Sequence, residues 1–161
     1  MVERIPMTRG GHEKLRLELI QLQREERPRV IKSIEVAREH GDLKENAEYH
    51  AAKERQSHIE GRIMELKDKL SRAEVIEVGD LDCERVVFGV VVKLVDLDTD
   101  EEVGYQLLGP EEASVETGSI SVLSPLGRAM IGKSVGDEIV VKTPGGVRQF
   151  EILDITLPAA G

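Results

Sequence analysis

The sequence predicts a chain in two parts: an antiparallel helical hairpin (a coiled coil) over residues 1–77, then a small α+β domain over residues 78–161. Charge divides the chain at this point. Residues 1–77 carry 16 basic and 16 acidic side chains, whereas residues 78–161 carry 6 and 15 and account for the whole net charge of −9. Eleven of the fifteen glycines and four of the six prolines also fall in the second part. Such a shift in composition favours helices first, then strands and turns.

Apolar residues in the first part recur at helical spacing, in two series. They are Leu15, Leu19, Leu22, Val30, Ile34 and Ala37, and then Ala52, Ile59, Ile63, Leu66, Leu70 and Ala73. Each series makes a narrow stripe on a charged helix, which is typical of a coiled-coil seam. Pro28 falls within the first series and predicts a lost hydrogen bond and a kink. Gly41 suits the end of the first helix and Asp42 the N-cap of the second, so the short loop between them predicts an antiparallel pair.

Short apolar runs separated by turn residues fill the second part. The run Val86–Val92 predicts a strand buried on both faces. Shorter strands are expected at Val103–Leu108, Ile120–Leu123, Asp137–Lys142 and Val147–Ile155. The segment Thr143–Gly146 is typical of a hairpin turn between the last two. Ser124 and Pro125 are typical of the cap and the first residue of a short helix.

The composition excludes several classes of protein. Four aromatic residues and no tryptophan cannot build a stacking platform for single-stranded nucleic acid. The single cysteine, Cys83, excludes an intramolecular disulfide and a cysteine-rich zinc site, and is expected to be a reduced packing residue. The longest apolar run is far shorter than the ~20 residues of a membrane helix, and charged residues and a proline interrupt any signal peptide at the start. We therefore expect a soluble, cytosolic protein.

Several motifs, in one order along the chain, resemble a known family. They are Ala37–Tyr49, with the sequence AREHGDLKENAEY, and the segments Ile5–Thr8, Ser124–Ala129, Gly132–Lys133 and Lys142–Gly146. These segments resemble the bacterial transcript cleavage factors of the Gre family, which are transcription elongation factors, and look most like its GreA branch. The resemblance covers essentially the full chain.

The resemblance implies a fold, partners and an activity. It implies an antiparallel coiled coil followed by a domain similar in fold to FK506-binding proteins. The expected partners are bacterial RNA polymerase, whose secondary channel takes the coiled coil, and the 3′ end of the nascent RNA. The expected activity is stimulation of the polymerase's own cleavage of backtracked RNA, which releases arrested complexes. We expect an accessory factor and not an enzyme, a monomer, and no membrane partner.

Asp42 and Glu45 match the family's metal-supporting pair. Mg²⁺ prefers one or two carboxylates together with waters and phosphates, so two acidic side chains on a thin tip could complete a weak metal site in another protein. By this interpretation the free protein binds no metal and has no cofactor of its own, and Mg²⁺ is held jointly with the polymerase. The spacing of Asp42 and Glu45 also fits a capping box. Spacing alone favours capping, and the resemblance favours a metal role that coexists with capping.

Polar side chains around the tip are candidate contacts with RNA or polymerase. They are Arg38, Lys44, Asn46, Tyr49 and Lys53. Tyr49 is equally consistent with local helix packing. His40 and His50 flank the tip, but histidine suits zinc and transition metals and not Mg²⁺, so packing or solvent exposure is their ordinary explanation.

A row of basic residues borders the second apolar series, and consists of Lys44, Arg55, Arg62 and Lys69. One interpretation is that these residues pair with acids on the first helix. The other is a weak electrostatic guide for RNA near the tip. Because the first part has no net charge, free nucleic acid should bind poorly.

Two rival functions come from other classes. One is a channel-binding protein of the same architecture that occludes or inhibits the polymerase; the presence of both Asp42 and Glu45 favours the activator instead. The other is a peptidyl-prolyl isomerase, which needs a pocket lined by several aromatic side chains, where only Phe88, Tyr105 and Phe150 are available. Fold analogy alone does not confer that activity.

Overall fold

A computed structural model describes residues 3–41 and 45–159, which form two compact units. The first unit holds His12–Ala73 and the residues before Ile5, and the second combines Ile5–Gly11 with the chain from Glu74 onward. A single cut after residue 77 does not reproduce this division, because strand β1 (Ile5–Thr8) pairs with β2 (Ala73–Ile76) in a small two-stranded sheet. Within the described residues, no helix has the length and apolar character that crossing a membrane requires.

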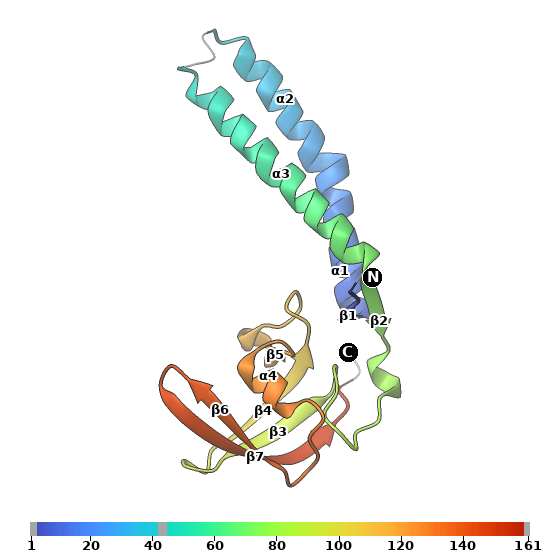
Figure 1. The fold of residues 1–161 in the computed structure, drawn as a ribbon. Helices are drawn as coiled ribbons and strands as arrows, with labels where there is room; N and C mark the ends of the chain where they lie inside the picture. Colours follow the sequence, from blue (N-terminus) through green and yellow to red (C-terminus); the bar gives the residue numbers. More distant parts are fainter. Residues whose placement is uncertain (1–2, 42–44, 160–161) are drawn as a thin grey trace. The chain divides into compact units, whose positions relative to one another are not determined.

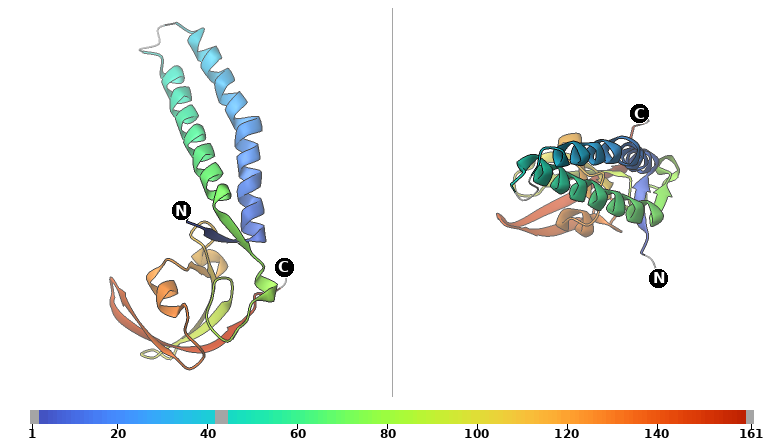
Figure 2. Two further views of the ribbon diagram at one scale, coloured as in Figure 1. Left: turned by 45° about the vertical axis from the view of Figure 1, so that its right-hand side comes forward. Right: turned by 90° about the horizontal axis from the view of Figure 1, so that it is seen from above.

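The first unit is a helical hairpin. One arm consists of α1 (Arg9–Gln21), a π-helical turn and α2 (Arg27–Arg38), and the returning arm is α3 (Ala47–Ser71). Figures 1 and 2 show α2 and α3 side by side and antiparallel, as the sequence predicts. At 1.5 Å per residue, α3 is about 37 Å long.

The disruption predicted at Pro28 takes the form of the π-helical turn Leu22–Glu26. Proline has no N–H for the carbonyl four residues earlier, and its ring crowds that carbonyl. In the turn before Pro28 the bonding shifts by one residue, so that the Arg27 N–H donates to Leu22 O. Pro28 then lies in the first turn of α2, where a helix does not need its N–H.

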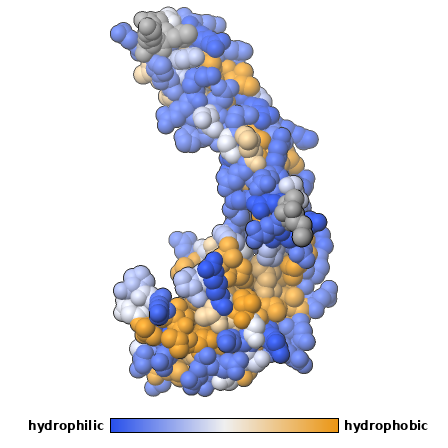
Figure 3. Space-filling view, viewed as in Figure 1, coloured by the Kyte–Doolittle hydropathy of each residue, from blue (hydrophilic) through white to orange (hydrophobic). Residues whose placement is uncertain are grey.

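The core of the hairpin is one narrow seam. Its buried residues are Leu15, Val30, Ile34, Ala37, Ala52, Ile63 and Leu66. All seven belong to the two apolar series of the sequence. In Figure 3 the visible surface of the hairpin is largely hydrophilic, with separate small hydrophobic patches.

The second unit is built on a five-stranded sheet of order β5-β4-β3-β7-β6. Its strands are β3 (Val91–Asp96), β4 (Glu102–Leu108), β5 (Ser119–Ser121), β6 (Glu138–Thr143) and β7 (Gly146–Thr156). Neighbouring strands are antiparallel, except that β4 and β5 are parallel. The short helix α4 (Pro125–Met130) lies on the concave face of the curved sheet and packs against β6 (Figure 1). Two 3₁₀ turns, Val78–Asp80 and Val115–Thr117, complete the unit.

A contiguous hydrophobic core fills this unit. It consists of Val86, Val90, Val92, Leu94, Leu107, Met130, Ile139, Val141, Phe150, Ile152 and Ile155. Met130 comes from α4, Val86 and Val90 come from the segment before β3, and the other core residues come from strands of the sheet. A helical hairpin followed by a small α+β domain is therefore confirmed as the fold class.

The predicted strand Val86–Val92 is wrong for all but its last two residues. Val86 and Val90 are fully buried, but the chain between them turns: the Val90 N–H donates to Val87 O (3.4 Å), and Gly89 has a φ of +96°. A side chain at Gly89 would lie 2.7 Å from Val78 Cγ1, so only glycine fits this turn. An apolar run can thus be a buried turn whose polar groups bond elsewhere, as when Val86 N–H donates to Lys133 O (2.8 Å).

The other local predictions for this unit agree closely with the structure. The strands at 103–108, 137–142 and 147–155 are found to within one residue at each end, and the turn closes with Thr143 paired to Gly146. Ser124 caps α4 by accepting a hydrogen bond from the Gly127 N–H (3.1 Å), with Pro125 as the first helical residue. The strand expected at 120–123 begins one residue earlier and is shorter.

Candidate functional site at the hairpin tip

The tip is the connection between the end of α2 and the start of α3. After Arg38 the backbone makes a tight turn, in which the His40 N–H donates to Ala37 O (3.2 Å) and Gly41 has a φ of +110°. Gly41 therefore ends the helix as predicted. Glu45 is exposed on the other side of the connection. Asp42 and Lys44, which the sequence also assigns to the site, lie outside the described residues.

Asn46, and not Asp42, is the N-cap of α3. The helix begins at Ala47, and the Tyr49 N–H donates to Asn46 Oδ1 at 3.0 Å. The capping-box interpretation of Asp42 and Glu45 is therefore wrong, because Glu45 precedes the helix instead of lying in its first turn. The physical reason is that the Asn46 amide serves both arms, since Nδ2 also donates to Ala37 O at 2.6 Å. A carboxylate at this position has no proton to donate.

The Asn46 clamp, meaning these two side-chain hydrogen bonds, fixes the width of the hairpin next to Glu45. One bond satisfies an N–H that the start of α3 leaves free, and the other is a second bond to Ala37 O, which also accepts from the His40 N–H. A contact of Asn46 with RNA or polymerase stays a prediction, and it would compete with both bonds. Glu45 is the residue immediately before the clamp, so its backbone is held from the α3 side.

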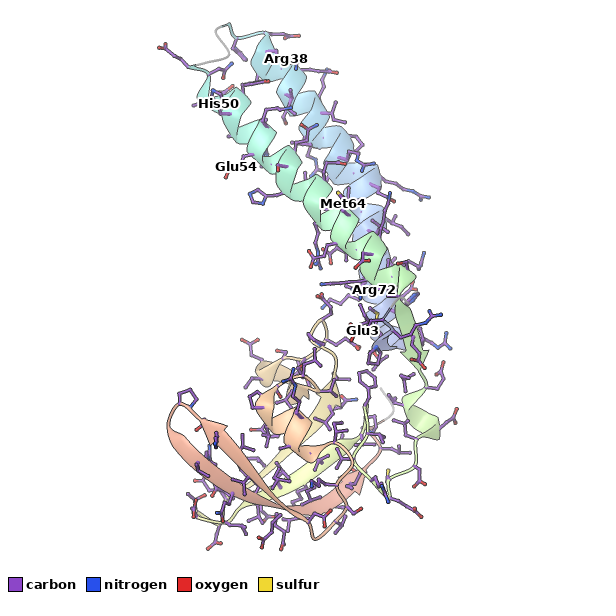
Figure 4. The ribbon with its side chains drawn as sticks, viewed as in Figure 1. Glu3, Arg38, His50, Glu54, Met64 and Arg72 are labelled. Carbon is purple, nitrogen blue, oxygen red and sulfur yellow. The ribbon has the colours of Figure 1, made fainter. Side chains whose placement is uncertain are left out.

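Aromatic and cationic side chains add a second link between the arms. The Arg38 guanidinium lies over the ring of Tyr49, with 5.9 Å between its central carbon and the ring centroid. The rings of Tyr49 and His50 meet edge to face at 5.6 Å. Figure 4 shows Arg38 on α2 and His50 on α3 near the same end of the hairpin. The packing interpretation of Tyr49 is confirmed, and its contact with RNA or polymerase stays a prediction.

The tip offers oxygen ligands for a hard cation without a complete cage. Within residues 3–41 and 45–159, no three His, Cys, Asp or Glu side chains converge as a metal site. Glu45 contributes an exposed carboxylate, which is a ligand type that Mg²⁺ prefers, and Asp42 would add a second. The prediction that the ion is held jointly with another macromolecule stays a prediction. Zinc chemistry would need the imidazoles of His40 and His50, and both residues are exposed.

Ion pairs account for most of the basic row on α3. Arg62 donates two hydrogen bonds to Glu18 of α1 (2.7 and 2.9 Å). Hydrogen bonding to Arg62 is the main reason why the pKa of the Glu18 carboxyl lies below its usual value. Lys69 pairs with Glu65 within α3 (2.7 Å). The pairing interpretation is therefore confirmed for Arg62. A second bidentate pair joins the arms closer to the tip, where Arg27 of α2 donates to Glu60 of α3 (2.7 Å for both bonds).

Arg55 and Lys53, two further basic residues of α3 near the tip, have different surroundings from Arg62 and Lys69. Arg55 lines an apolar groove of about 530 Å³ between α2 and α3, together with Arg29 and Lys32. Lys53 is exposed and donates to Gln56 Oε1 (3.1 Å). Guidance of RNA by this part of the hairpin stays a prediction.

A pocket of about 290 Å³ lies in the second unit. Tyr105 and Phe150 line it, whereas Phe88 is absent from its lining. Asp96, 3% exposed, closes one side: it pairs with Arg148 and accepts from the N–H groups of Asp98 (2.9 Å) and Thr99 (3.3 Å). The Arg148 hydrogen bond is the main reason why the pKa of Asp96 lies below its usual value. Two rings instead of three line this pocket, fewer than the isomerase interpretation requires.

Comparison with known proteins places the chain in a family. The family model described as transcription elongation factor, N-terminal, matches residues 5–75, and the one described as transcription elongation factor, GreA/GreB, C-terminal, matches residues 81–157. Transcription elongation factor GreA of Desulfotalea psychrophila is 68% identical over 155 residues, which cover 96% of each chain. The chain belongs to the GreA/GreB family of transcription elongation factors. The resemblance stated from the sequence motifs is thereby confirmed.

Other GreA/GreB-family proteins are similar over the same span. Transcription elongation factor GreA of Rhizobium etli is 57% identical over 156 residues, which cover 97% of this chain and 99% of that one. Among solved structures, GreA factor homolog 1 (Gfh1) of Thermus thermophilus is 34% identical and covers 95% of this chain and 99% of its own, with a TM-score of 0.45.

For this GreA/GreB-family chain, sequence reasoning missed the structural role of Asn46. The signal was present, because asparagine is among the best N-cap residues and stands three residues before Tyr49, whose N–H it accepts. Asp42 obscured this signal, because aspartate also favours the N-cap position and Asp42 directly follows Gly41. Choosing between the two caps required knowing that Asn46 also reaches Ala37.

Proposed function

We propose that this protein binds bacterial RNA polymerase, inserts its helical hairpin into the secondary channel, and stimulates the polymerase's Mg²⁺-dependent cleavage of the 3′ end of backtracked RNA. Arrested complexes are thereby released, and the protein acts as a cytoplasmic accessory factor and not as an enzyme. The family membership supports this activity. The observation that carries it is an exposed carboxylate, Glu45, at the end of a hairpin whose core is a single seam.

The shape of the hairpin supports action inside another macromolecule. The buried residues among the described part of the hairpin form one line between the arms, which leaves no interior there in which to enclose a substrate. At its end, the Asn46 clamp and the Arg38–Tyr49 contact hold the two arms together. A thin, internally braced tip can carry a functional group into a narrow channel, whereas catalysis on its own would need a pocket that excludes water.

Asp42 and Glu45 are the residues that we propose hold a Mg²⁺ ion jointly with the polymerase. The chemistry supplied there is activation of water for attack on the RNA phosphodiester. Glu45 can offer both carboxylate oxygens to this task, because Asn46 performs the capping that would otherwise engage Glu45. Arg38, Lys44 and Lys53 are proposed to draw the phosphates of the RNA 3′ end toward the tip.

The second unit is proposed to provide the polymerase-binding surface and to have a fold similar to FK506-binding proteins. Its curved, mostly antiparallel sheet with a helix on the concave face supports that comparison. Hydrophobic side chains exposed on this unit support a docking role, among them Leu123 (56% exposed) and Val140 (59%). We propose that the protein acts as a monomer.

The direct test uses a stalled, backtracked bacterial polymerase complex that carries end-labelled RNA. Adding the purified protein with Mg²⁺ should accelerate shortening of the transcript, and resumed elongation should follow when nucleotides are supplied. The protein incubated with the same RNA but without polymerase should cleave nothing, because two carboxylates without further protein ligands hold Mg²⁺ too weakly alone.

Two results would contradict the proposal in different ways. Cleavage of RNA by the protein alone would make it a nuclease. Slower cleavage or slower elongation after the protein is added would make it a channel-blocking inhibitor. The comparison should use the full chain, because a cut after residue 77 would separate β1 from the unit with which it packs.

A further inference from the structure

An open groove runs between α2 and α3 in the half of the hairpin next to the tip. Its volume is about 530 Å³, and its lining comes from residues 29–37 of α2 and 48–55 of α3. Small side chains make this space: Ala37 and Ala52 are buried in the seam, and Ala51 beside them is too short to cover it. The groove belongs entirely to the first unit, and its volume lies within the range of natural ligand sites.

The groove exposes apolar surface that the hairpin does not use. Val36 lines the groove and is 42% exposed, and it belongs to neither of the two apolar series of the seam. Ala51 adds an exposed methyl group from the other arm. Removing such surface from water is favourable, so an aliphatic side chain of a partner would be stabilised by packing here.

The charge around the groove is mostly positive. Three basic residues and one acidic residue line it, namely Arg29, Lys32 and Arg55, with Glu48. Glu48 lies in the first turn of α3, where the helix dipole offsets a negative charge. The lining therefore complements a partner that carries carboxylates.

The basic side chains are available to such a partner. Arg29 pairs with Glu26 (3.1 Å) and Lys32 with Glu35 (4.0 Å), and both pairs lie on the exposed surface of α2. Exposed pairs of this kind are weak, so a partner's carboxylate can replace either acid at little cost. Arg55 is exposed, and its side chain makes no ion pair or hydrogen bond within residues 3–41 and 45–159.

The chemistry of the lining favours a protein segment over nucleic acid. Single-stranded nucleic acid stacks its bases on aromatic rings, and none of the described residues that line the groove is aromatic. Phosphates would use the basic residues and leave Val36 and Ala51 in water. An amphipathic helix that lies along a groove uses both features, since its apolar side chains enter the groove and its carboxylates reach the edge.

The spacing of the lining residues specifies the partner further. Ala51 and Arg55 are four residues apart on α3, which is about 6 Å along the helix. A partner helix that lies along α3 therefore needs a carboxylate about one turn from its apolar side chain. Residues three or four positions apart on a helix have this spacing.

We propose that this groove is a docking surface for an acidic amphipathic helix of a partner protein, whose aliphatic side chain packs on Val36 and Ala51 and whose carboxylate pairs with Arg55. The identity of the partner rests on the proposed function, by which the helix belongs to the wall of the polymerase channel. The contact holds the hairpin close to its tip, at a site separate from the residues that we propose hold Mg²⁺.

The first experiment uses the full-length protein with two synthetic helical peptides and no polymerase. One peptide carries leucine and glutamate at positions i and i+4 of an alanine-rich helix, and the other has lysine in place of glutamate. Changes in the NMR shifts of the Val36 and Ala51 amides report binding. The glutamate peptide should bind about fivefold more tightly than the lysine peptide, and Arg55→Glu should reverse this preference.

The second experiment measures competition of full-length variants for a backtracked polymerase complex. Arg55→Glu reverses a charge at the groove, and Ala51→Gln fills the groove without changing the charge. Lys67→Glu and Ser57→Gln are the matched controls, at exposed positions of α3 outside the groove. Arg55→Glu should lower the affinity about tenfold and Ala51→Gln about threefold, while both controls stay within about twofold of the wild type. Because all four positions are exposed, each variant should keep the helical circular dichroism signal of the wild type.

Several results would overturn the proposal. The glutamate peptide would fail to shift Val36 and Ala51, or a ten-nucleotide oligouridylate would shift them in its place, which would make the groove an RNA surface. Shifts of the same amides that grow with protein concentration alone would assign the groove to a second copy of the chain. Wild-type polymerase affinity of both Arg55→Glu and Ala51→Gln would overturn the polymerase as the partner.

Failure of the proposed function gives a different result. A wild-type protein that neither binds polymerase nor stimulates cleavage would overturn that function, whereas the peptide experiment would still decide whether the groove accepts an acidic helix.

Discussion

The hairpin and the second unit bury their apolar residues in different arrangements. In the described part of the hairpin, seven buried residues form one line between the arms, and side-chain bonds such as Arg62–Glu18 and the Asn46 clamp join the arms. In the second unit, eleven buried residues from the turns, four strands and α4 touch in one cluster. A line of contacts can open locally, whereas a cluster loses its contacts together. The comparison indicates that stability is local in the hairpin and cooperative in the second unit.

The largest expected difference is between two fully buried leucines. Leu94→Ala in the cluster should lower the free energy of unfolding of the second unit by about 3–5 kcal/mol. Leu66→Ala in the seam should cost the hairpin only about 2–3 kcal/mol, because two helices can move together and fill part of the space. Hydrogen exchange by mass spectrometry during urea unfolding follows each unit separately. Equal losses of unfolding free energy for Leu94→Ala and Leu66→Ala would contradict the difference between the cluster and the seam.

The sequence predicted the hairpin better than the connections around it. Helical periodicity is local, so the two apolar series identified all seven residues of the seam. Val86–Val90 has the composition of a buried strand, and the turn at Gly89 depends on Val78 and Leu81, which approach it only in the folded unit. The same limit explains why the hydrogen bond from the Thr8 N–H to Glu112 Oε2 could not be predicted, since it joins residues about a hundred positions apart.

At the tip, the sequence predicted which residue types are present, but not which residue caps α3 and which is left for metal support. Acidic residues at positions 42 and 45 suit both capping and metal support, and periodicity cannot separate the two roles. The structure gives capping to Asn46, because Asn46 alone among the described tip residues bonds to both Ala37 and Tyr49. Residues 42–44 lie outside the described residues, so the predicted roles of Asp42 and Lys44 stay predictions.

The next effect should come from the Asn46 clamp. Asn46→Ala removes both side-chain bonds and should destabilise the hairpin by about 1–2 kcal/mol. Asn46→Asp is the informative comparison, because it still accepts from the Tyr49 N–H but cannot donate to Ala37 O. It should lose roughly half as much, measured by thermal melting of the helical circular dichroism signal. An Asn46→Asp protein as stable as the wild type would show that the bond between the arms adds nothing.

The smallest effect concerns the ion pair Glu18–Arg62. A double-mutant cycle with Glu18→Gln and Arg62→Met should give a coupling energy of about 0.5 kcal/mol, since both side chains are about a third exposed and salt screens them. Lys14 and Glu65 also act on Glu18, with opposite signs, and they stay constant through the cycle.

The pH dependence of this coupling has a definite sign. Folding lowers the pKa of Glu18 from its ordinary value of 4.5, so the coupling is complete above pH 4.5 and is lost as the pH falls through the lowered pKa. The double-mutant cycle repeated between pH 7 and pH 3 measures this. A coupling that is unchanged at pH 3, or that grows there, would contradict the assignment.

The central claim is that the tip carboxylates serve chemistry and not folding, and transcript cleavage by Glu45→Gln tests it most directly. Glu48→Gln is the matched control, because it removes the same charge from an exposed position three residues away, inside α3. Glu45→Gln, like Asp42→Asn, should melt within about 1 kcal/mol of the wild type and still compete for polymerase. Its stimulated cleavage should fall about tenfold or more and recover partly as Mg²⁺ is raised, while Glu48→Gln stays close to wild type. Wild-type cleavage by both Glu45→Gln and Asp42→Asn would contradict the claim.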